Sequence, residues 1–276
     1  LASIPLIGFL IFGLVPLVLA MAMAFMKMQD FGFEGAEWAG LENFKTVLTD
    51  PMFWDSVVNT LWMGTSTLIR QVLALIIAYF LSKPIRAKKA FRMIYFVPYV
   101  CSVVAVTLMW KYMFNTNYGI INQMLGKTGD NAIDWLGDSD FFTWAVIIMS
   151  VWSGMGFGII LYTAALTGVN QSMVEAAKID GAGAFRTFWN VVLPSISPTS
   201  FYLLVMGVIG ALQSFAVTNV LATEGGPNGD GITIVFYLYR RVFSYEKQYG
   251  VSRLETSGPD FFKYYSTQRP VDIATY

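Results

Sequence analysis

A run of charged and very small side chains is the part of this sequence whose residue types and spacing could do chemistry. It reads EAAKID, from Glu175 to Asp180. Glu175, Lys178 and Asp180 can make charge-assisted hydrogen bonds. Ala176 and Ala177 have almost no side chain, so a partner surface could approach the backbone closely. Two interpretations stay open from the residues alone: a surface that docks another molecule, or an amphipathic connector lying on a membrane, which uses the same residue types.

The residue types exclude most bond-making chemistry. The chain of 276 residues contains no histidine, which excludes Ser-His-Asp and Cys-His catalysis and histidine-ligated metal sites. Its one cysteine, Cys101, cannot form an internal disulfide. The letters LGKT at 125–128 resemble the end of a phosphate-binding loop, but Ile121 stands where that motif needs a glycine. We therefore expect no enzyme activity, no metal site and no cofactor bound by this chain.

Small and polar residues also occur inside apolar runs. Gly154 and Gly158 form a G-x-x-x-G pair, which predicts either close helix packing or, alternatively, a bend or a thin wall beside a substrate path. Farther along, polar side chains interrupt another apolar stretch, and such groups pack between helices or line a cavity. They are Gln213, Ser214, Thr218 and Asn219.

Arg70 is the one charge deep inside an apolar run. A charge at that depth costs about 2.5 to 3.5 kcal/mol on insertion scales. Three explanations remain open: an ion pair inside a helical bundle, a side chain that snorkels toward the cytoplasm, or a contact to an anionic substrate.

Membrane helices must position these residues. Hydrophobic residues make up 55% of the chain and charged residues only 13%, whereas a soluble domain carries roughly 25% charged residues. A helix crosses a bilayer with about 20 apolar residues. The first apolar run is too long for a signal peptide and lacks a cleavage site leading into a soluble domain, so we interpret it as a span. The predicted spans are Ile4 to Met26, Val57 to Leu81, Met93 to Trp110, Phe141 to Leu166 and Ile196 to Ala222.

The loops between the spans predict their orientation. The loop after the second span reads KPIRAKKAFR and carries five basic residues without an acid, so the positive-inside rule places it in the cytoplasm. The loops at 27–56 and between the third and fourth spans are mainly acidic and fit the outside. The segment at 170–198, between the fourth and fifth spans, is then cytoplasmic. We call it the docking segment. No sixth apolar span is evident at 251–276.

Within the docking segment, the local sequence predicts two short helices. Val174 to Asp180 can form the first helix, and Gly181 and Gly183 then loosen the backbone. Pro194 is expected to end the second helix just before the fifth span. An apolar stripe at helical spacing should mark that second helix. It consists of Phe185, Phe188, Trp189 and Val192.

The pattern E-A-A-x-x-D-G-A, followed by a phenylalanine, by L-P and by a further proline, resembles the EAA loop of ABC importer permeases. Here it is formed by Glu175, Ala176, Ala177, Asp180, Gly181, Ala182, Phe188, Leu193, Pro194 and Pro198. Four other stretches resemble the carbohydrate branch of that family, the permeases similar to the maltose, lactose and glycerol-3-phosphate importers. They are VVNTLWMG from 57, FRMIYFVPYVCSVVAVTLMWKYMF from 91, YGIINQML from 118 and TEGGPNGDGITIVFYLYRRVF from 223.

The resemblance implies an all-α fold, a polytopic membrane helical bundle of the type I ABC importer permease kind, in a bacterial or archaeal cytoplasmic membrane. It implies a transmembrane domain at 1–250 with the coupling loop at 170–198. The polar tail at 251–276 stands where the family has its last helix. In the loop, the resemblance makes Glu175 a polar contact to a separate ATPase and Gly181 the turn. Ala176 and Ala177 become the close-approach face.

The resemblance also implies the partners and the cargo. The expected partners are a second homologous permease, cytoplasmic ATP-binding subunits that use the ATP, and an extracytoplasmic sugar-binding protein. Stretches that supply sugar contacts in the family correspond loosely to Gly158, Gln213, Ser214 and Phe215. The expected function is the membrane-spanning subunit of an ATP-driven sugar importer. The alternative is a secondary transporter or channel, a class that usually buries several ionisable residues in its spans.

Overall fold

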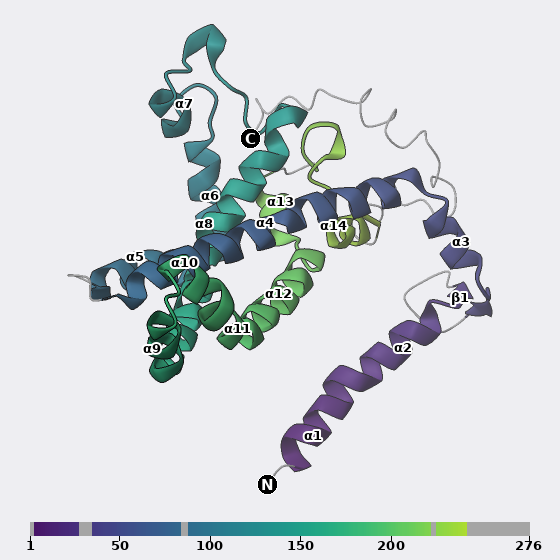
Figure 1. Cartoon of the computed structure of the whole chain (residues 1–276). Helices are drawn as coiled ribbons and strands as arrows, with labels where there is room; N and C mark the ends of the chain where they lie inside the picture. The colour runs from purple at the N-terminus through teal and green to yellow at the C-terminus, as the bar shows by residue number, and fades with distance from the viewer. Residues whose placement is uncertain (1–2, 28–34, 84–87, 222–224, 242–276) are drawn as a thin grey trace. The chain divides into compact units, whose positions relative to one another are not determined.

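The computed structural model of the chain describes residues 3–27, 35–83, 88–221 and 225–241, most of which are helical (Figure 1). The chain divides into two compact units. One contains the described residues up to Phe53 together with Tyr239–Arg241, and the other contains the described residues between 54 and 238.

The first unit begins with a 21-residue apolar helical run that confirms the first predicted span. Pro16 lies near the start of the helix at Val15–Met23 and has no N–H to donate. A wide π-helical turn lies directly before that helix. None of the side chains in the run is buried within the chain, as expected for a helix that contacts lipid. The parts are α1 (Ser3–Phe9), η1 (Leu10–Leu14) and α2 (Val15–Met23).

A two-stranded sheet and a short helix follow this run. Strand β1 (Met26–Lys27) pairs antiparallel with β2 (Glu37–Trp38). Asn43 of α3 (Glu42–Leu48) donates its side-chain amide to the carbonyl oxygens of Ala24 and Met26, both at 2.9 Å. This one amide therefore ties α3 to the end of α2.

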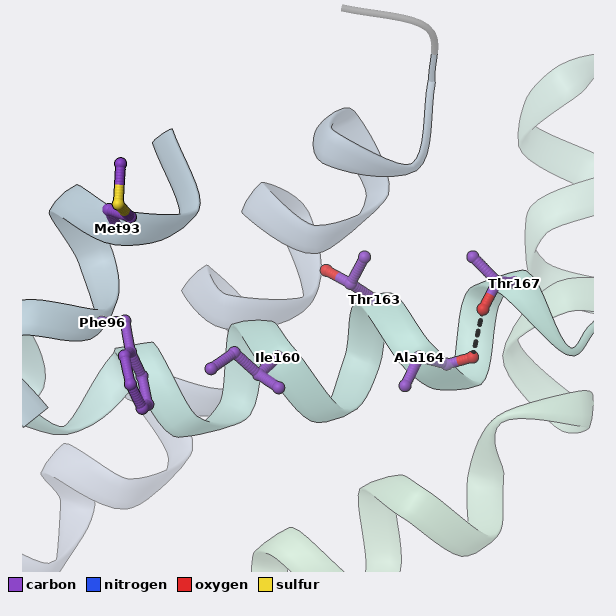
Figure 2. Close-up of a pocket in the computed structure, with 6 residues that line it drawn as sticks. All are labelled: Met93, Phe96, Ile160, Thr163, Ala164 and Thr167. Carbon is purple, nitrogen blue, oxygen red and sulfur yellow. Dashed lines mark hydrogen bonds between the residues drawn. The ribbon is translucent and has the colours of Figure 1, made fainter. Parts of the chain in front are cut away.

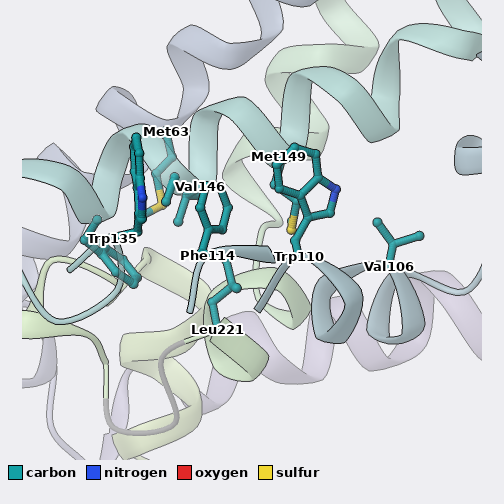
Figure 3. Close-up of a cluster of buried hydrophobic side chains, with 10 residues drawn as sticks. Met63, Val106, Trp110, Phe114, Trp135, Val146, Met149 and Leu221 are labelled. Carbon is teal, nitrogen blue, oxygen red and sulfur yellow. The ribbon is translucent and has the colours of Figure 1, made fainter. Parts of the chain in front are cut away.

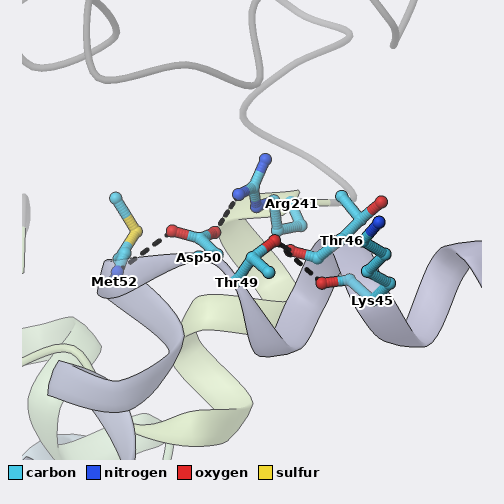
Figure 4. Close-up of polar contacts among 6 residues, drawn as sticks. All are labelled: Lys45, Thr46, Thr49, Asp50, Met52 and Arg241. Atoms are coloured by element: carbon cyan, nitrogen blue, oxygen red, sulfur yellow. Dashed lines mark hydrogen bonds and ion pairs between the residues drawn. The ribbon is translucent and has the colours of Figure 1, made fainter.

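Asp50 makes polar contacts near the boundary of the first unit (Figure 4). The carboxylate of Asp50 accepts the backbone N–H of Met52 at 3.0 Å and forms an ion pair with Arg241. The hydroxyl of Thr49 donates to the carbonyl oxygen of Lys45 at 2.8 Å. The ion pair joins two positions that are 191 residues apart in the sequence.

Two long helices organise the second unit and confirm the second and fourth predicted spans (Figure 1). They are α4 (Pro51–Ser82), with 32 residues, and α8 (Ser139–Thr167), with 29 residues. Asp138 caps the start of α8 because its carboxylate accepts the N–H of Asp140 at 3.0 Å.

The third predicted span is broken, which corrects the expectation of one helix from Met93 to Trp110. Helix α5 (Lys88–Val100) and helix α6 (Val103–Met113) meet at an angle of 107°. Pro98 inside α5 cannot donate an intrahelical hydrogen bond, and Ser102 has an extended backbone (ψ 130°). An apolar composition therefore predicts membrane depth here without predicting a straight helix.

The fifth predicted span is also interrupted. A helical run at Ala184–Ser195 meets the next helix at an angle of 66°, and the backbone breaks at Ile196, two residues after Pro194. A second break, at Gln213 to Phe215, divides the predicted span itself. The parts are α10 (Ala184–Thr187), η3 (Phe188–Val192), α11 (Leu193–Ser195), α12 (Ser197–Leu212) and α13 (Ala216–Leu221).

Two clusters of buried hydrophobic side chains hold the second unit together. The first is aromatic (Figure 3): the ring of Phe114 lies 5.1 Å from that of Trp110 and 5.5 Å from that of Trp135. The second joins α4, α8 and α12 through smaller residues, including Ala74, Ala78 and Leu203. The remaining elements are α7 (Ile120–Met124), η2 (Gly129–Asn131), α9 (Gln171–Ile179), η4 (Pro227–Gly229) and α14 (Ile234–Tyr239).

Candidate functional site

The segment at 170–198 forms a helix, a turn and a second helix between α8 and α12 (Figure 1). Asn170 caps α9: its side-chain oxygen accepts the N–H of Ser172 at 3.0 Å and the hydroxyl at 2.8 Å. Glu175, Ala176 and Ala177 all lie on α9, so the first predicted helix is confirmed.

Gly181 forms the turn after α9, as the sequence predicts. Its φ is +78°, a left-handed conformation that strains side chains other than glycine. The N–H of Ala182 donates to the carbonyl of Ala177 at 2.9 Å, and the N–H of Gly181 donates to that of Lys178 at 3.1 Å. This pair of bonds is a Schellman motif, so the glycine sets the direction in which the chain leaves α9.

The second helix presents two kinds of aromatic residue. Phe188 packs against Tyr79 of α4, with ring centroids 5.2 Å apart. Phe185 and Trp189, by contrast, are exposed. The rings of the predicted apolar stripe lie side by side, with that of Trp189 6.0 Å from Phe185 and 6.1 Å from Phe188. Only part of the stripe packs against the bundle: Phe188 anchors the segment, whereas Phe185 and Trp189 stay exposed in this chain. The helical run also contains the π-helical turn η3 directly before Leu193 and Pro194.

The exposed side of the segment combines apolar and charged side chains. Ile179 is 86% exposed and Phe185 is 77% exposed, although both are large and hydrophobic. Glu175, Lys178 and Asp180 are exposed as well, and in the part of the chain that the structure describes no ion pair satisfies them. The exposure of Ile179 was not predicted from the sequence, although its position directly before Asp180 could have indicated an exposed apolar residue.

The break at Gln213 to Phe215 leaves backbone groups without helical partners, and residues near α14 satisfy some of them. The hydroxyl of Thr233 donates to the carbonyl of Ser214 at 2.6 Å. The ring of Phe215 lies 5.8 Å from that of Phe236. Gln213 is exposed. Discontinuous spans of this kind form many transporter binding sites.

Two polar residues of α4 fix the loop at 225–233, and neither was singled out from the sequence. Asn59 donates to the carbonyl oxygens of Gly229 at 3.0 Å and Ile232 at 3.3 Å. The hydroxyl of Thr60 accepts the N–H of Ile234 at 3.0 Å and so caps α14. Their polarity inside an apolar helix was the signal that could have found them.

Gly158 lies in a close helix contact. A Cβ added there would lie 3.0 Å from the Cβ of Ala74 and 4.0 Å from a methyl group of Leu203. One turn earlier, a Cβ at Gly154 would overlap the guanidinium of Arg70. The G-x-x-x-G pair thus brings α8 close to α4.

An apolar groove of about 530 Å³ lies between α5 and α8 (Figure 2). Its lining is apolar apart from two threonine hydroxyls, one of which, on Thr167, donates to the carbonyl of Ala164 at 2.7 Å. The other lining residues are Met93, Phe96, Ile160 and Thr163. Among the residues that the structure describes, no group of three or more histidine, cysteine or acidic side chains could hold a metal ion.

Apolar helices with broken spans, joined by an exposed helix–turn–helix, are typical of a polytopic membrane transport component. The chain belongs to the family described as binding-protein-dependent transport system inner membrane component, whose model matches residues 71–246. It is therefore a multi-pass protein of the cytoplasmic membrane and the permease component of a binding-protein-dependent ABC transport system. This membership does not favour the alternative of a secondary transporter or channel.

Two relatives and a solved structure agree with this membership. The sn-glycerol-3-phosphate transport system permease protein UgpA of Pectobacterium atrosepticum is 32% identical over 85% of this chain and 79% of its own length. The arabinooligosaccharides transport system permease protein AraP of Bacillus subtilis is 29% identical over 89% of this chain and 79% of its own length. A bacterial ABC transporter that imports alginate is 26% identical, with a TM-score of 0.69 over 88% of this chain and 82% of that chain.

Proposed function

We propose that this chain is one of two homologous membrane-spanning subunits of an ATP-driven importer for sugars or sugar derivatives. Its relatives are named for glycerol-3-phosphate and arabinooligosaccharides, and a solved relative was crystallised with a periplasmic protein carrying an alginate pentasaccharide. The chain forms half of the translocation path and binds no ATP. Separate cytoplasmic subunits bind and hydrolyse ATP, and an extracytoplasmic protein delivers the substrate.

The exposed face of the segment at 170–198 is the observation that carries the coupling part of this proposal. Ile179 and Phe185 expose large apolar surfaces beside Glu175 and Asp180. Exposed apolar residues ringed by charges are typical of a protein–protein contact. The small side chains of Ala176 and Ala177 let the partner approach the α9 backbone.

The connections of this segment suggest how its movement reaches the spans. Only Gly168 to Asn170 separate α8 from α9, so a shift of α9 is passed directly to α8. At the other end, the run into α12 is anchored by the buried Ile196 and by Phe188 against Tyr79. Closure of the ATPase subunits would then rotate α8 and α12 as rigid bodies and open the path alternately to either side.

The substrate path belongs to the proposal too. Gln213, Ser214 and Phe215 stand at a break within a span, where an exposed amide and an aromatic ring can bind sugar hydroxyls and the apolar face of a sugar. Gly158 would act on the path indirectly, because it sets the distance between α8 and α4.

Substitution of Gly181 by Trp, or of Glu175 by Arg, tests the docking role. We expect both variants to reach the membrane, to lose co-purification with the ATPase subunit and to lose uptake of a radiolabelled sugar in cells. The Gly181→Trp change strains a φ of +78° in a turn that has open space around it, so it should alter the docking surface and leave the bundle intact.

The chain provides matched controls. Gly126 also has a positive φ (+66°) with open space around it, and Asp130 is an exposed acid, both in the loop between α7 and α8. Gly126→Trp and Asp130→Arg should keep the ATPase bound. Retention of the ATPase in Gly181→Trp and Glu175→Arg would refute the docking role.

A further inference from the structure

Arg70 is the only charged residue near the middle of a span in the part of the chain that the structure describes. It lies 12 residues before the end of α4 at Ser82, a distance of about 18 Å along a helix. A snorkelling side chain would extend along α4 toward the membrane surface. The structure instead places the guanidinium beside Gly154 of α8 and Gly207 of α12, so the side chain is turned into the helical bundle.

An ion pair within the bundle does not account for Arg70 either. Among the described residues, no carboxylate pairs with its guanidinium and no hydrogen bond to it is recorded. The amide nitrogen of the next residue, Gln71, is buried and has no hydrogen-bond partner there. Within the described ranges, this turn of α4 thus holds a cation without an ion pair and, on Gln71, a buried donor without a hydrogen-bond partner.

Two glycines on neighbouring helices make room for the guanidinium. A Cβ added to Gly154 of α8 would overlap its Nη1 and lie 2.8 Å from the Cδ of Arg70. A Cβ added to Gly207 of α12 would lie 3.2 Å from its Nη2. Beside it, the hydroxyl of Thr67 donates to the carbonyl of Gly207 at 3.2 Å. The charged group is therefore held between α8 and α12, the two helices that the docking segment connects.

We infer that Arg70 binds an anionic group of the transported substrate, a carboxylate or phosphate, inside the helical bundle between α4, α8 and α12. The inference rests on the proposed function and narrows its substrate class to acidic sugars or sugar phosphates. A guanidinium presents a planar fork of donors that matches such groups in two-point contact. Far from water, an anion gains more from this contact than it would at the surface.

The expected consequence is selective stabilisation of the protein by acidic sugars. The test uses the complex that co-purifies with the full-length chain, reconstituted in nanodiscs, with the midpoint of thermal unfolding as readout. Sodium D-glucuronate should raise the midpoint as its concentration increases, because a ligand that binds only the folded state stabilises it. D-glucose with sodium chloride at the same ionic strength should leave the midpoint unchanged.

Arg70→Gln should abolish the effect of glucuronate, while Lys111→Gln should preserve it. Lys111 is a matched control because it is a cation at a span end whose ammonium already donates to the carbonyl of Val220, at 3.3 Å. An equal rise in Arg70→Gln, or no rise in the native complex, would overturn the inference. If the Arg70→Gln variant does not assemble, the glucuronate titration is repeated with the Arg70→Lys variant. A half-effect concentration at least tenfold higher supports the two-point contact, and an unchanged one refutes it.

This readout is independent of ATP hydrolysis and of uptake. A complex that retains its ATPase and shows no response to glucuronate refutes the anion site alone. A complex that responds to glucuronate but contains no ATPase refutes the coupling proposal and leaves the anion site standing.

Discussion

Three glycines of α8 meet three different neighbours, although they stand in one short sequence, GMGFG. Gly154 faces the guanidinium of Arg70, and Gly158 faces Ala74. Gly156, between them, faces α5: an added Cβ would overlap the carbonyl oxygen of Tyr95 and lie 3.1 Å from its carbonyl carbon. A flexible arginine end can move aside, whereas a backbone carbonyl cannot. The middle glycine is therefore the one that the helix packing requires most strictly.

Gly156→Ala should destabilise the second unit by about 1–3 kcal/mol, the cost of overpacking a fitted contact. The thermal unfolding midpoint of the protein in nanodiscs is the measurement. Gly210→Ala on α12 is the matched control because nothing lies within 4 Å of its added Cβ, and alanine there should be neutral or slightly stabilising. A Gly156→Ala protein as stable as the control would contradict the close contact between α5 and α8.

At the scale of helices, hydropathy identifies the spans and fails at their breaks. It places α4 and α8 correctly because a long uninterrupted apolar run satisfies its own backbone only as a helix. It predicts one straight helix at 93–110, where the structure bends by 107°. Pro98 was the available signal, but the direction and size of the bend depend on packing against α8, including the contact of Tyr95 with Gly156. Such contacts between distant positions cannot be read from one sequence.

The docking segment likewise combines a feature that the sequence predicts with one that it does not. The turn at Gly181 was predictable because only glycine adopts that backbone without strain. Which residues of the apolar stripe are covered by the bundle was not predictable, because helical spacing places Phe185 and Phe188 on one broad face. Tyr79, more than 100 positions earlier in the sequence, decides which of the two is covered.

Ile179→Glu and Phe185→Glu should therefore leave stability unchanged and weaken ATPase binding at least tenfold, as expected when central apolar contacts are replaced by charge. Both side chains are mostly exposed in this chain, so the substitutions remove little internal packing. Binding can be measured by titrating purified ATPase subunit onto nanodiscs. Met124→Glu is the control: it is 82% exposed on α7 and should bind the ATPase normally. Equal affinity in all three variants would show that this apolar face is not the contact.

At the scale of the whole molecule, the proposal depends on which side of the membrane each loop faces. The loop at 125–138 and the segment at 170–183 lie at opposite ends of α8, which is 29 residues long and so spans the bilayer completely. If one end is outside, the other must be inside. The positive-inside rule assigns the inside to the segment at 170–183, through the basic sequence that follows the second span.

Single cysteines in a Cys101→Ser background test this assignment. Lys127→Cys and Lys178→Cys both place the thiol at an exposed position, one at each end of α8. A membrane-impermeant maleimide added to intact spheroplasts should label position 127 and leave position 178 unlabelled until the membrane is permeabilised. Bound ATPase should then slow the labelling of position 178, because the docking surface is covered. Labelling of position 178 from outside in intact spheroplasts would place the segment on the wrong side of the membrane from any ATPase, and no substitution in it could then act through coupling.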